Sequence, residues 1–297
     1  MGCRERPQIR QIDHLVFPVT TLTLARSRLT SLGFKVAPDA RHPFGTGNCC
    51  IFFQNRTYLE PITIIDRNRA DMAAAERVVF VKRLKRFTER QGEGFAMVAL
   101  KSKDAEADSA AIAEKGAGSQ PAARFTRMAR LSDGSEMEVG FVTAFADFPA
   151  APDATFFVCQ HLAADVLFQP EYLEHPNGGQ GVASVIAVAE TPEEFRTMLT
   201  VATGRKKLTS IEFGLEAKIG SQSVLILTRE GFRARYDLDP PNPRRGLLFA
   251  AFEITVLDLD RAAGYAGAKA KRREDAIVIP AAPGLGVVMA FRRAPNA

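Results

Sequence analysis

Imidazole and carboxylate side chains stand inside two apolar segments that would hold them rigidly. His14 lies in the apolar run 12–19, and Glu60 lies in the run 58–65, where Pro61 follows it directly. Imidazole nitrogen and carboxylate oxygen suit divalent Fe, Zn, Ni, Mn or Co, and a buried carboxylate needs a metal, another cation or a proton. A lone histidine among apolar neighbours is also commonly a hydrogen-bonded core residue. Residue type alone leaves both interpretations open.

A second set of polar residues lies in loops. His42 and Asn48 lie at either side of a Gly-Thr-Gly stretch, whose backbone N–H groups could face an anionic substrate, although a turn explains the glycines equally well. His175 begins a His-Pro-Asn-Gly sequence in a long connection, which is typical of a tight turn but could reach the same cavity. These three residues are the candidates for substrate binding.

The cysteines offer little chemistry of their own. The four cysteines form neither a C-x-x-C pair nor a secreted-type framework, which favours a reduced, cytoplasmic protein. Cys159 and His161 are two residues apart and could share a strand face, but no third acid is evident to orient the histidine. A thiol nucleophile is therefore not expected.

Repeated strand and helix patterns position these residues. At four places an apolar, strand-like run passes through a polar turn into a helix-like stretch. Further strand-like runs follow each helix, so each place predicts a strand-helix-strand-strand-strand unit, of which the fourth is short. The predicted opening strand and helix pairs are 12–19 with 22–32, 95–100 with 104–113, 182–188 with 192–201, and 247–256 with 259–266.

Two segments fall outside this pattern. Residues 66–90 are predicted as one basic connecting helix, because Phe80, Leu84 and Phe87 recur at helical spacing. Residues 150–181 form a connection rich in proline and glycine, which places a domain boundary near residue 180. The chain is therefore predicted to contain one domain over 1–180 and a second over 181–297.

Composition excludes several classes of protein. A chain of 297 residues that is 46% hydrophobic can bury two packed cores, so a disordered chain is excluded. The net charge of +5 is too small for a dedicated nucleic-acid binder. No apolar run reaches the roughly 18 residues that span a bilayer, so no membrane role is expected.

The tandem units resemble the vicinal oxygen chelate superfamily, and in particular its glyoxalase-like branch, which belongs to the glyoxalase, bleomycin resistance and extradiol dioxygenase fold. The resemblance is most specific in Ile-Asp-His-Leu-Val at 12–16, the loop 41–48 and Tyr-Leu-Glu at 58–60. It implies an α+β protein of tandem βαβββ units, which curl in pairs into two half-open, mixed-sheet barrels. The first barrel would hold a divalent metal, and the second would be degenerate.

Carried over by position, the resemblance implies His14 as the first-strand ligand and Glu60 as the last-strand ligand of the first unit. Glu138 matches the last-strand ligand of the second unit. The first-strand position of that unit falls on Ala96, so one histidine is missing, and we infer His161 from a different strand as its substitute.

Three functions remain compatible with these residues. Adjacent substrate oxygens chelated by a metal would acidify a carbon-bound proton, with Glu60 or Glu138 as the base, as in a lactoylglutathione lyase. With Fe(II), His14, His161 and one of these carboxylates would instead permit extradiol-type dioxygen chemistry. Without a complete ligand set, the same cupped fold would only bind or sequester a small molecule. We expect the first function, in a monomer or homodimer that takes a small-molecule substrate.

Overall fold

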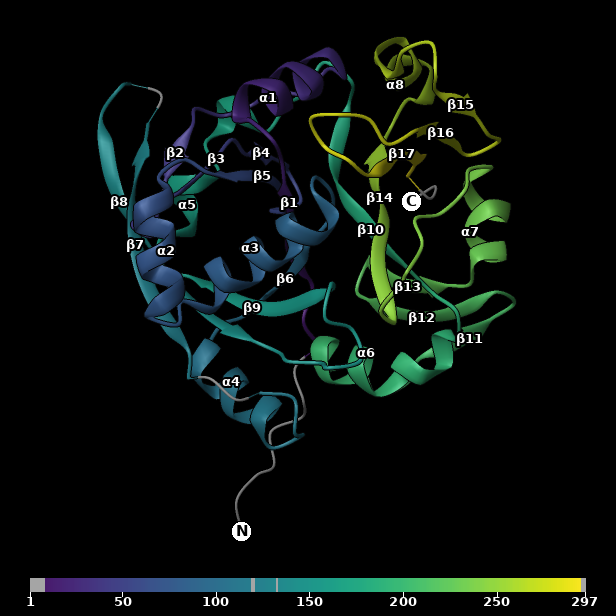
Figure 1. The fold of residues 1–297 in the computed structure, drawn as a ribbon. Helices are drawn as coiled ribbons and strands as arrows, with labels where there is room; N and C mark the ends of the chain where they lie inside the picture. The colour runs from purple at the N-terminus through teal and green to yellow at the C-terminus, as the bar shows by residue number, and fades with distance from the viewer. Residues whose placement is uncertain (1–8, 119–120, 132, 295–297) are drawn as a thin grey trace.

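The computed structural model describes residues 9–118, 121–131 and 133–294, which form two mixed sheets flanked by helices (Figure 1). The first sheet has the strand order β2-β3-β5-β1-β6-β9-β8-β7, and β4 also pairs with β5. The second has the order β11-β12-β13-β10-β14-β17-β16-β15. Among the described residues, no helix is both long and apolar enough to cross a membrane.

The first sheet is built from two βαβββ units. Its strands are β1 Ile12–Pro18, β2 Ala40–Arg41, β3 Thr46–Asn48, β4 Ile51–Phe52, β5 Tyr58–Ile64, β6 Met97–Lys101, β7 Ala123–Arg130, β8 Glu136–Phe145 and β9 Thr155–His161. Within each unit the first and last strands are parallel, β1 with β5 and β6 with β9. The two units join through the antiparallel pair β1 and β6. The end strands β2 and β7 approach each other, so the sheet curls into a nearly closed barrel.

The second sheet repeats this plan. Its strands are β10 Gly179–Ala189, β11 Thr209–Ile211, β12 Gly214–Ile219, β13 Gln222–Leu227, β14 Leu247–Val256, β15 Lys271–Arg272, β16 Ala276–Ile279 and β17 Val288–Arg293. Here β10 and β14 form the antiparallel central pair, in the place of β1 and β6. The described residues thus show two tandem domains of the vicinal oxygen chelate type.

The helices lie outside the sheets or connect the units. They are α1 Leu22–Ser31, α2 Arg67–Ala75, α3 Val79–Gln91, α4 Ala105–Ala113, α5 Ala164–Leu167, α6 Arg196–Thr203, α7 Arg229–Tyr236 and α8 Leu259–Ala266, with short 3-10 helices at Pro170–Tyr172 and Pro192–Phe195. The segment 66–90 was expected to be one helix, but it forms α2 and α3. The first ends near Arg77, which has a positive φ of 67° that an α-helix does not contain.

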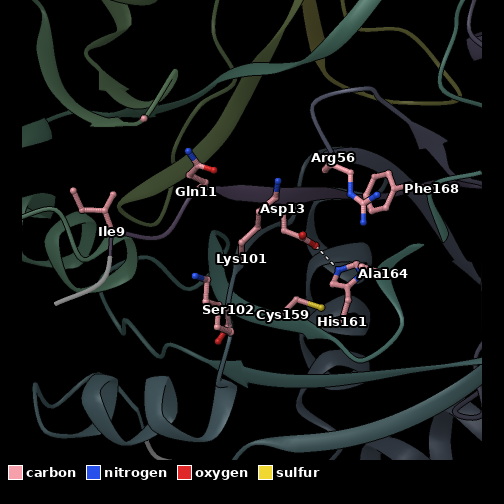
Figure 2. A pocket seen from close by; sticks show the side chains of 12 residues that line it. Ile9, Gln11, Asp13, Arg56, Lys101, Ser102, Cys159, His161, Ala164 and Phe168 are labelled. Carbon is pink, nitrogen blue, oxygen red and sulfur yellow. Dashed lines mark hydrogen bonds and ion pairs between the residues drawn. The ribbon is translucent and has the colours of Figure 1, made fainter. Parts of the chain in front are cut away.

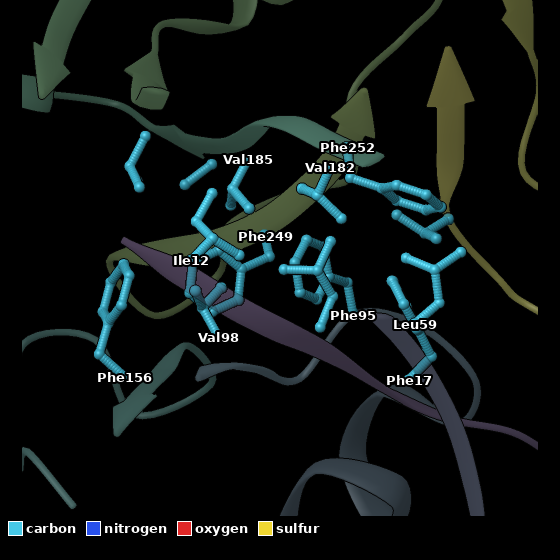
Figure 3. Close-up of a cluster of buried hydrophobic side chains, with 14 of the residues drawn as sticks. Ile12, Phe17, Leu59, Phe95, Val98, Phe156, Val182, Val185, Phe249 and Phe252 are labelled. Carbon is cyan, nitrogen blue, oxygen red and sulfur yellow. The ribbon is translucent and has the colours of Figure 1, made fainter. Parts of the chain in front are cut away.

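Apolar side chains from both sheets form one core between the domains (Figure 3). Phe17 of β1 packs against Phe252 of β14 with ring centroids 5.0 Å apart, and Phe95 packs against Phe249 at 4.8 Å. Alternate residues of the same strands, such as Val16 and Met97, face the interior of the first barrel instead. The outer face of the first barrel is thus covered by the second sheet.

Two segments differ from what the sequence pattern indicates. Residues 155–161 form β9, the last strand of the second unit, and not part of a connection. Residues 232–236 have a spacing that also fits a strand, but they end helix α7, whose first turn is capped when Thr228 Oγ1 accepts a hydrogen bond from the Gly231 backbone N–H at 3.1 Å. The spacing of Phe232 and Tyr236 fits both the two-residue period of a strand and the 3.6-residue period of a helix, and the N-terminal cap favours the helix.

Candidate metal centre

A bulge in β1 determines which side chains reach the barrel interior. Ile12 pairs with Leu100 and His14 pairs with Ala99, so Asp13 is the extra residue in the ladder. Strict alternation would place Ile12 and His14 on one face. Instead, Ile12 joins the core between the domains, while Asp13 and His14 both contact interior groups.

Asp13 links two histidines. Its Oδ2 accepts hydrogen bonds from His14 Nδ1 at 2.7 Å and from His161 Nε2 at 2.8 Å. Burial alone would raise the pKa of the Asp13 carboxyl, but the neighbouring His161 and His14 outweigh burial and hold this pKa well below its usual range. A carboxylate that accepts a hydrogen bond from one nitrogen of a histidine ring fixes the tautomer and the orientation of that ring. Histidines that bind a metal through their other nitrogen commonly have such a carboxylate partner.

Glu60 faces the other nitrogen of His14. In the parallel pair of β1 and β5, Glu60 lies beside Val16, two residues beyond His14. His14 Nε2 and Glu60 Oε2 are 3.5 Å apart, and both side chains are almost fully buried. Asn48 Nδ2 donates a 2.6 Å hydrogen bond to Glu60 Oε1, and His42 Nε2 lies 3.7 Å from the same oxygen.

The chemistry of this pair fits a divalent metal. Because His14 Nδ1 donates to Asp13, its Nε2 is the nitrogen that remains to accept a cation or a proton, and the facing Glu60 oxygen is also an acceptor. Two buried acceptors that face each other require a cation or a proton between them. Nitrogen and oxygen ligands lie about 2.1 Å from a metal such as zinc, so two ligands at a tetrahedral angle are about 3.4 Å apart. The observed 3.5 Å matches this separation.

A small aromatic cavity adjoins the pair. Its volume is about 40 Å³, and His14, His42, Asn48 and Glu60 supply polar groups to its wall. Burial, with a smaller contribution from the Arg127 charge, lowers the pKa of His42 to about 3, so this imidazole is neutral at pH 7. Five phenylalanine rings complete the lining, namely Phe44, Phe80, Phe125, Phe141 and Phe157.

A second group of possible metal ligands surrounds Asp13. One ligand atom from each of Asp13, His14, Cys159 and His161 lies within 4.8 Å of the others. Asp13, Cys159 and His161 also line an open pocket of about 630 Å³ (Figure 2). In this group His14 Nδ1 and His161 Nε2 already donate hydrogen bonds to Asp13 Oδ2, whereas His14 Nε2 faces Glu60 Oε2 at 3.5 Å. The His14 and Glu60 pair is therefore the better candidate centre.

The remaining candidates from the sequence lie elsewhere. Glu138 is exposed on β8, opposite Met128, and it does not line the cavity beside Glu60. The reason is that β9, and not β8, is the last strand of its unit. His161 does lie close to His14, but the two are joined through Asp13 and His161 lines the open pocket.

His175 lies outside the cavity and joins two loops. Its Nδ1 accepts from the Lys35 backbone N–H at 3.1 Å, and its Nε2 donates to the Phe52 carbonyl at 3.0 Å. The ring packs between Phe34 and Phe53, with centroids 5.4 and 5.0 Å away. These contacts indicate a packing role, not the substrate contact expected from its sequence.

His175 should make the protein less stable in mild acid. Burial is the main cause that lowers its pKa to about 4 from an ordinary 6.5. Because the folded-state pKa is the lower one, this stabilisation is complete above pH 6.5 and declines as the pH falls towards 4. Between pH 7 and pH 5 we expect a loss of about 2 kcal/mol in the free energy of unfolding, measured with urea. In His175→Gln this part of the decline should disappear, and an unchanged slope would contradict the assignment.

Two residues of the cavity region were missed in the sequence. Strict alternation would put Asp13 on the strand face opposite His14, and no residue type in β1 indicates the bulge. Arg127 lies on β7 and also lines the cavity, but an arginine in an alternating strand has no special sequence signal.

Comparisons with known proteins agree with this architecture. A hypothetical protein from Staphylococcus aureus has a TM-score of 0.69 at 12% identity, with 96% of this chain and 100% of that chain covered. The Mn(II)-bound glyoxalase from Novosphingobium aromaticivorans has a TM-score of 0.55 at 9% identity, covering 96% and 82% of the two chains. A 4-hydroxymandelate synthase mutant from Streptomyces coelicolor also has 0.55, at 11% identity, covering 97% and 94%.

These identities establish a shared fold and nothing further about activity. No curated protein is a match to this sequence. The model of one protein family, described as a glyoxalase-like domain, matches residues 12–203, which is more than half of the chain. Together with the tandem βαβββ units, this match shows that the chain belongs to the glyoxalase-like domain family.

Proposed function

We propose that this protein is a metal-dependent, glyoxalase-like enzyme that binds a small substrate through two adjacent oxygens and transfers a carbon-bound proton. The observation that carries the proposal is the buried pair of acceptors, His14 Nε2 and Glu60 Oε2, 3.5 Å apart. His14 and Glu60 would hold the metal, with Asp13 fixing the histidine ring. Their nitrogen and oxygen donors fit Zn, Mn, Fe, Co or Ni.

The metal would supply Lewis acidity to substrate oxygens, which lowers the pKa of a neighbouring C–H group. Glu60 is the candidate base, since it is the carboxylate in the cavity wall, and its Oε2 would take the proton when released from the metal. Asn48 holds one Glu60 oxygen at 2.6 Å and thereby orients the other. Neutral His42 adds a polar group without a competing positive charge, and the phenylalanine rings exclude water from the base.

Hydrogen exchange at carbon would test this proposal. Protein loaded with one equivalent of Zn(II) or Mn(II) is expected to exchange the C–H protons of hydroxyacetone with D₂O, which NMR can follow. Glu60→Gln should lose this exchange, whereas Glu138→Gln should retain it because Glu138 is exposed on β8. Absence of exchange with every metal, or equal exchange in Glu60→Gln, would contradict the proposal.

Dioxygen chemistry is the second candidate, favoured by the cluster of Asp13, His14 and His161. Two histidines and one carboxylate form the usual ligand set of non-haem Fe(II) oxygenases. In this cluster, however, both histidines donate to one Asp13 oxygen. Oxygen uptake with catechol and Fe(II), without hydrogen exchange, would favour this second function over the first.

A further inference from the structure

Two residues that separate the aromatic cavity from a neighbouring groove have polar atoms without partners. Arg127 and Asn48 line the cavity beside Glu60, and both also line a groove on its other side. Arg127 Nε and Asn48 Oδ1 are buried, and no described residue forms a hydrogen bond with either atom. A buried polar group without a partner is unfavourable, so a bound ligand is a natural partner for both atoms.

The two atoms have opposite requirements. Asn48 donates its Nδ2 to Glu60 Oε1 at 2.6 Å, which leaves Oδ1 as a free acceptor. Arg127 is held at its Nη1, which donates to the Met128 carbonyl at 3.2 Å, and its guanidinium lies 5.5 Å from the Phe141 ring centre. Its Nε is a free donor on a cation. A ligand that pairs with both atoms would therefore supply an anionic acceptor to Arg127 Nε and a hydroxyl donor to Asn48 Oδ1.

The rest of the cavity limits what else a ligand can carry. Of the described residues in its wall, Arg127 is the one arginine or lysine. The phenylalanine rings offer no hydrogen-bond donors, and the hydroxyl groups of Tyr58 and Thr143 carry no charge that could pair with a ligand. A volume of about 40 Å³ holds about three water molecules, which favours a ligand of few carbons.

We infer that the substrate is a short 2-hydroxy carboxylate, whose carboxylate accepts from Arg127 Nε and whose hydroxyl donates to Asn48 Oδ1. This inference rests on the proposed function, since it takes the cavity of His14 and Glu60 as the active site. The carboxylate and hydroxyl oxygens are adjacent, as chelation of one metal requires. A carboxylate without the hydroxyl leaves Asn48 Oδ1 unpaired, and a diol leaves the Arg127 charge unpaired.

Three ligands of similar size separate these contributions. Lactate carries both groups, propanoate lacks the hydroxyl, and 1,2-propanediol lacks the carboxylate. In calorimetric titrations of the full chain loaded with Zn(II), we expect lactate to bind at least about tenfold more tightly than either analogue. Equal affinities for the three ligands would overturn the inference without any variant.

Arg127 provides the matched variants. Arg127→Met should weaken lactate at least about tenfold while leaving 1,2-propanediol unchanged, and Arg127→Lys should retain part of the preference. Arg124→Met is the control, because Arg124 is exposed on the same strand and does not line the cavity. Unchanged lactate affinity in folded Arg127→Met would refute the role of Arg127, and the ligand series still decides if that variant does not fold.

The same proteins distinguish this inference from the proposed function. Metal titration without ligand reports on His14 and Glu60 alone. Metal binding without a preference for lactate would overturn the inference and leave the proposed function standing. A preference for lactate that depends on Arg127 in protein that binds no metal would support the inference and overturn the proposed metal chemistry.

Discussion

Replacement of His14 by alanine is expected to abolish stoichiometric binding of Zn(II) or Mn(II). The substitution removes the imidazole nitrogen that faces Glu60 Oε2 at 3.5 Å, and one carboxylate oxygen is a poor site by itself. Asp13→Asn should weaken binding about 10- to 100-fold, because it disturbs the group that orients the His14 ring. Both effects can be measured by calorimetric titration of metal into the metal-free protein.

A matched histidine separates this effect from damage to the fold. His175→Gln alters another buried histidine that contacts Lys35 and Phe52 and no residue of the cavity wall, so it should bind metal as the wild type does. Retention of metal by His14→Ala, with loss in His161→Ala, would place the metal centre at Asp13, Cys159 and His161 instead. That result would contradict our assignment of His14 and Glu60.

Glu253→Gln is expected to destabilise the protein by about 3–5 kcal/mol. Glu253 is fully buried in β14, and its carboxylate accepts two hydrogen bonds each from Arg235 and Arg292 at 2.8–2.9 Å. Tyr236 donates a further hydrogen bond to it at 2.8 Å. An amide cannot accept all of these bonds, and it leaves two largely buried guanidinium groups without their carboxylate. Urea unfolding at pH 7 would measure the loss.

The same carboxylate predicts a pH dependence. Burial would raise the pKa of Glu253, but the hydrogen bonds and charges of Arg235 and Arg292 hold it at about 2, below the ordinary 4.5. Its stabilisation is therefore complete above pH 4.5 and lost as the pH falls towards 2. Glu253→Gln should lack this decline. As a control, Glu193→Gln removes an exposed pair with Arg196 and should change stability little, and an equal loss in both variants would contradict the prediction.

Much of the fold follows from local patterns in the sequence. The opening strands β1, β6, β10 and β14 are long apolar runs, each followed by a helix, so their periodicity identifies the four units. Strand β9 was missed because it lies within a segment rich in proline and glycine, and its membership depends on pairing with β6 and β8. Long-range pairing of this kind leaves no local signal.

The residues of the candidate site could likewise be predicted only in part. His14, Glu60, His42 and Asn48 are brought together, because the loop and strands of one unit meet at one cavity. Glu138 was misplaced as a direct consequence of the missing β9. The orienting role of Asp13 depends on a single extra residue in a ladder, which only the paired strands reveal.

The core between the domains links the stability of the first barrel to the second sheet. Within the second sheet, Glu253 forms ion pairs with two arginines. At the interface, Phe249 and Phe252 cover Phe95 and Phe17 of the first barrel. A fragment that ends before β10 would expose these rings to water and should aggregate. We therefore expect the second domain to be required for the solubility of the first.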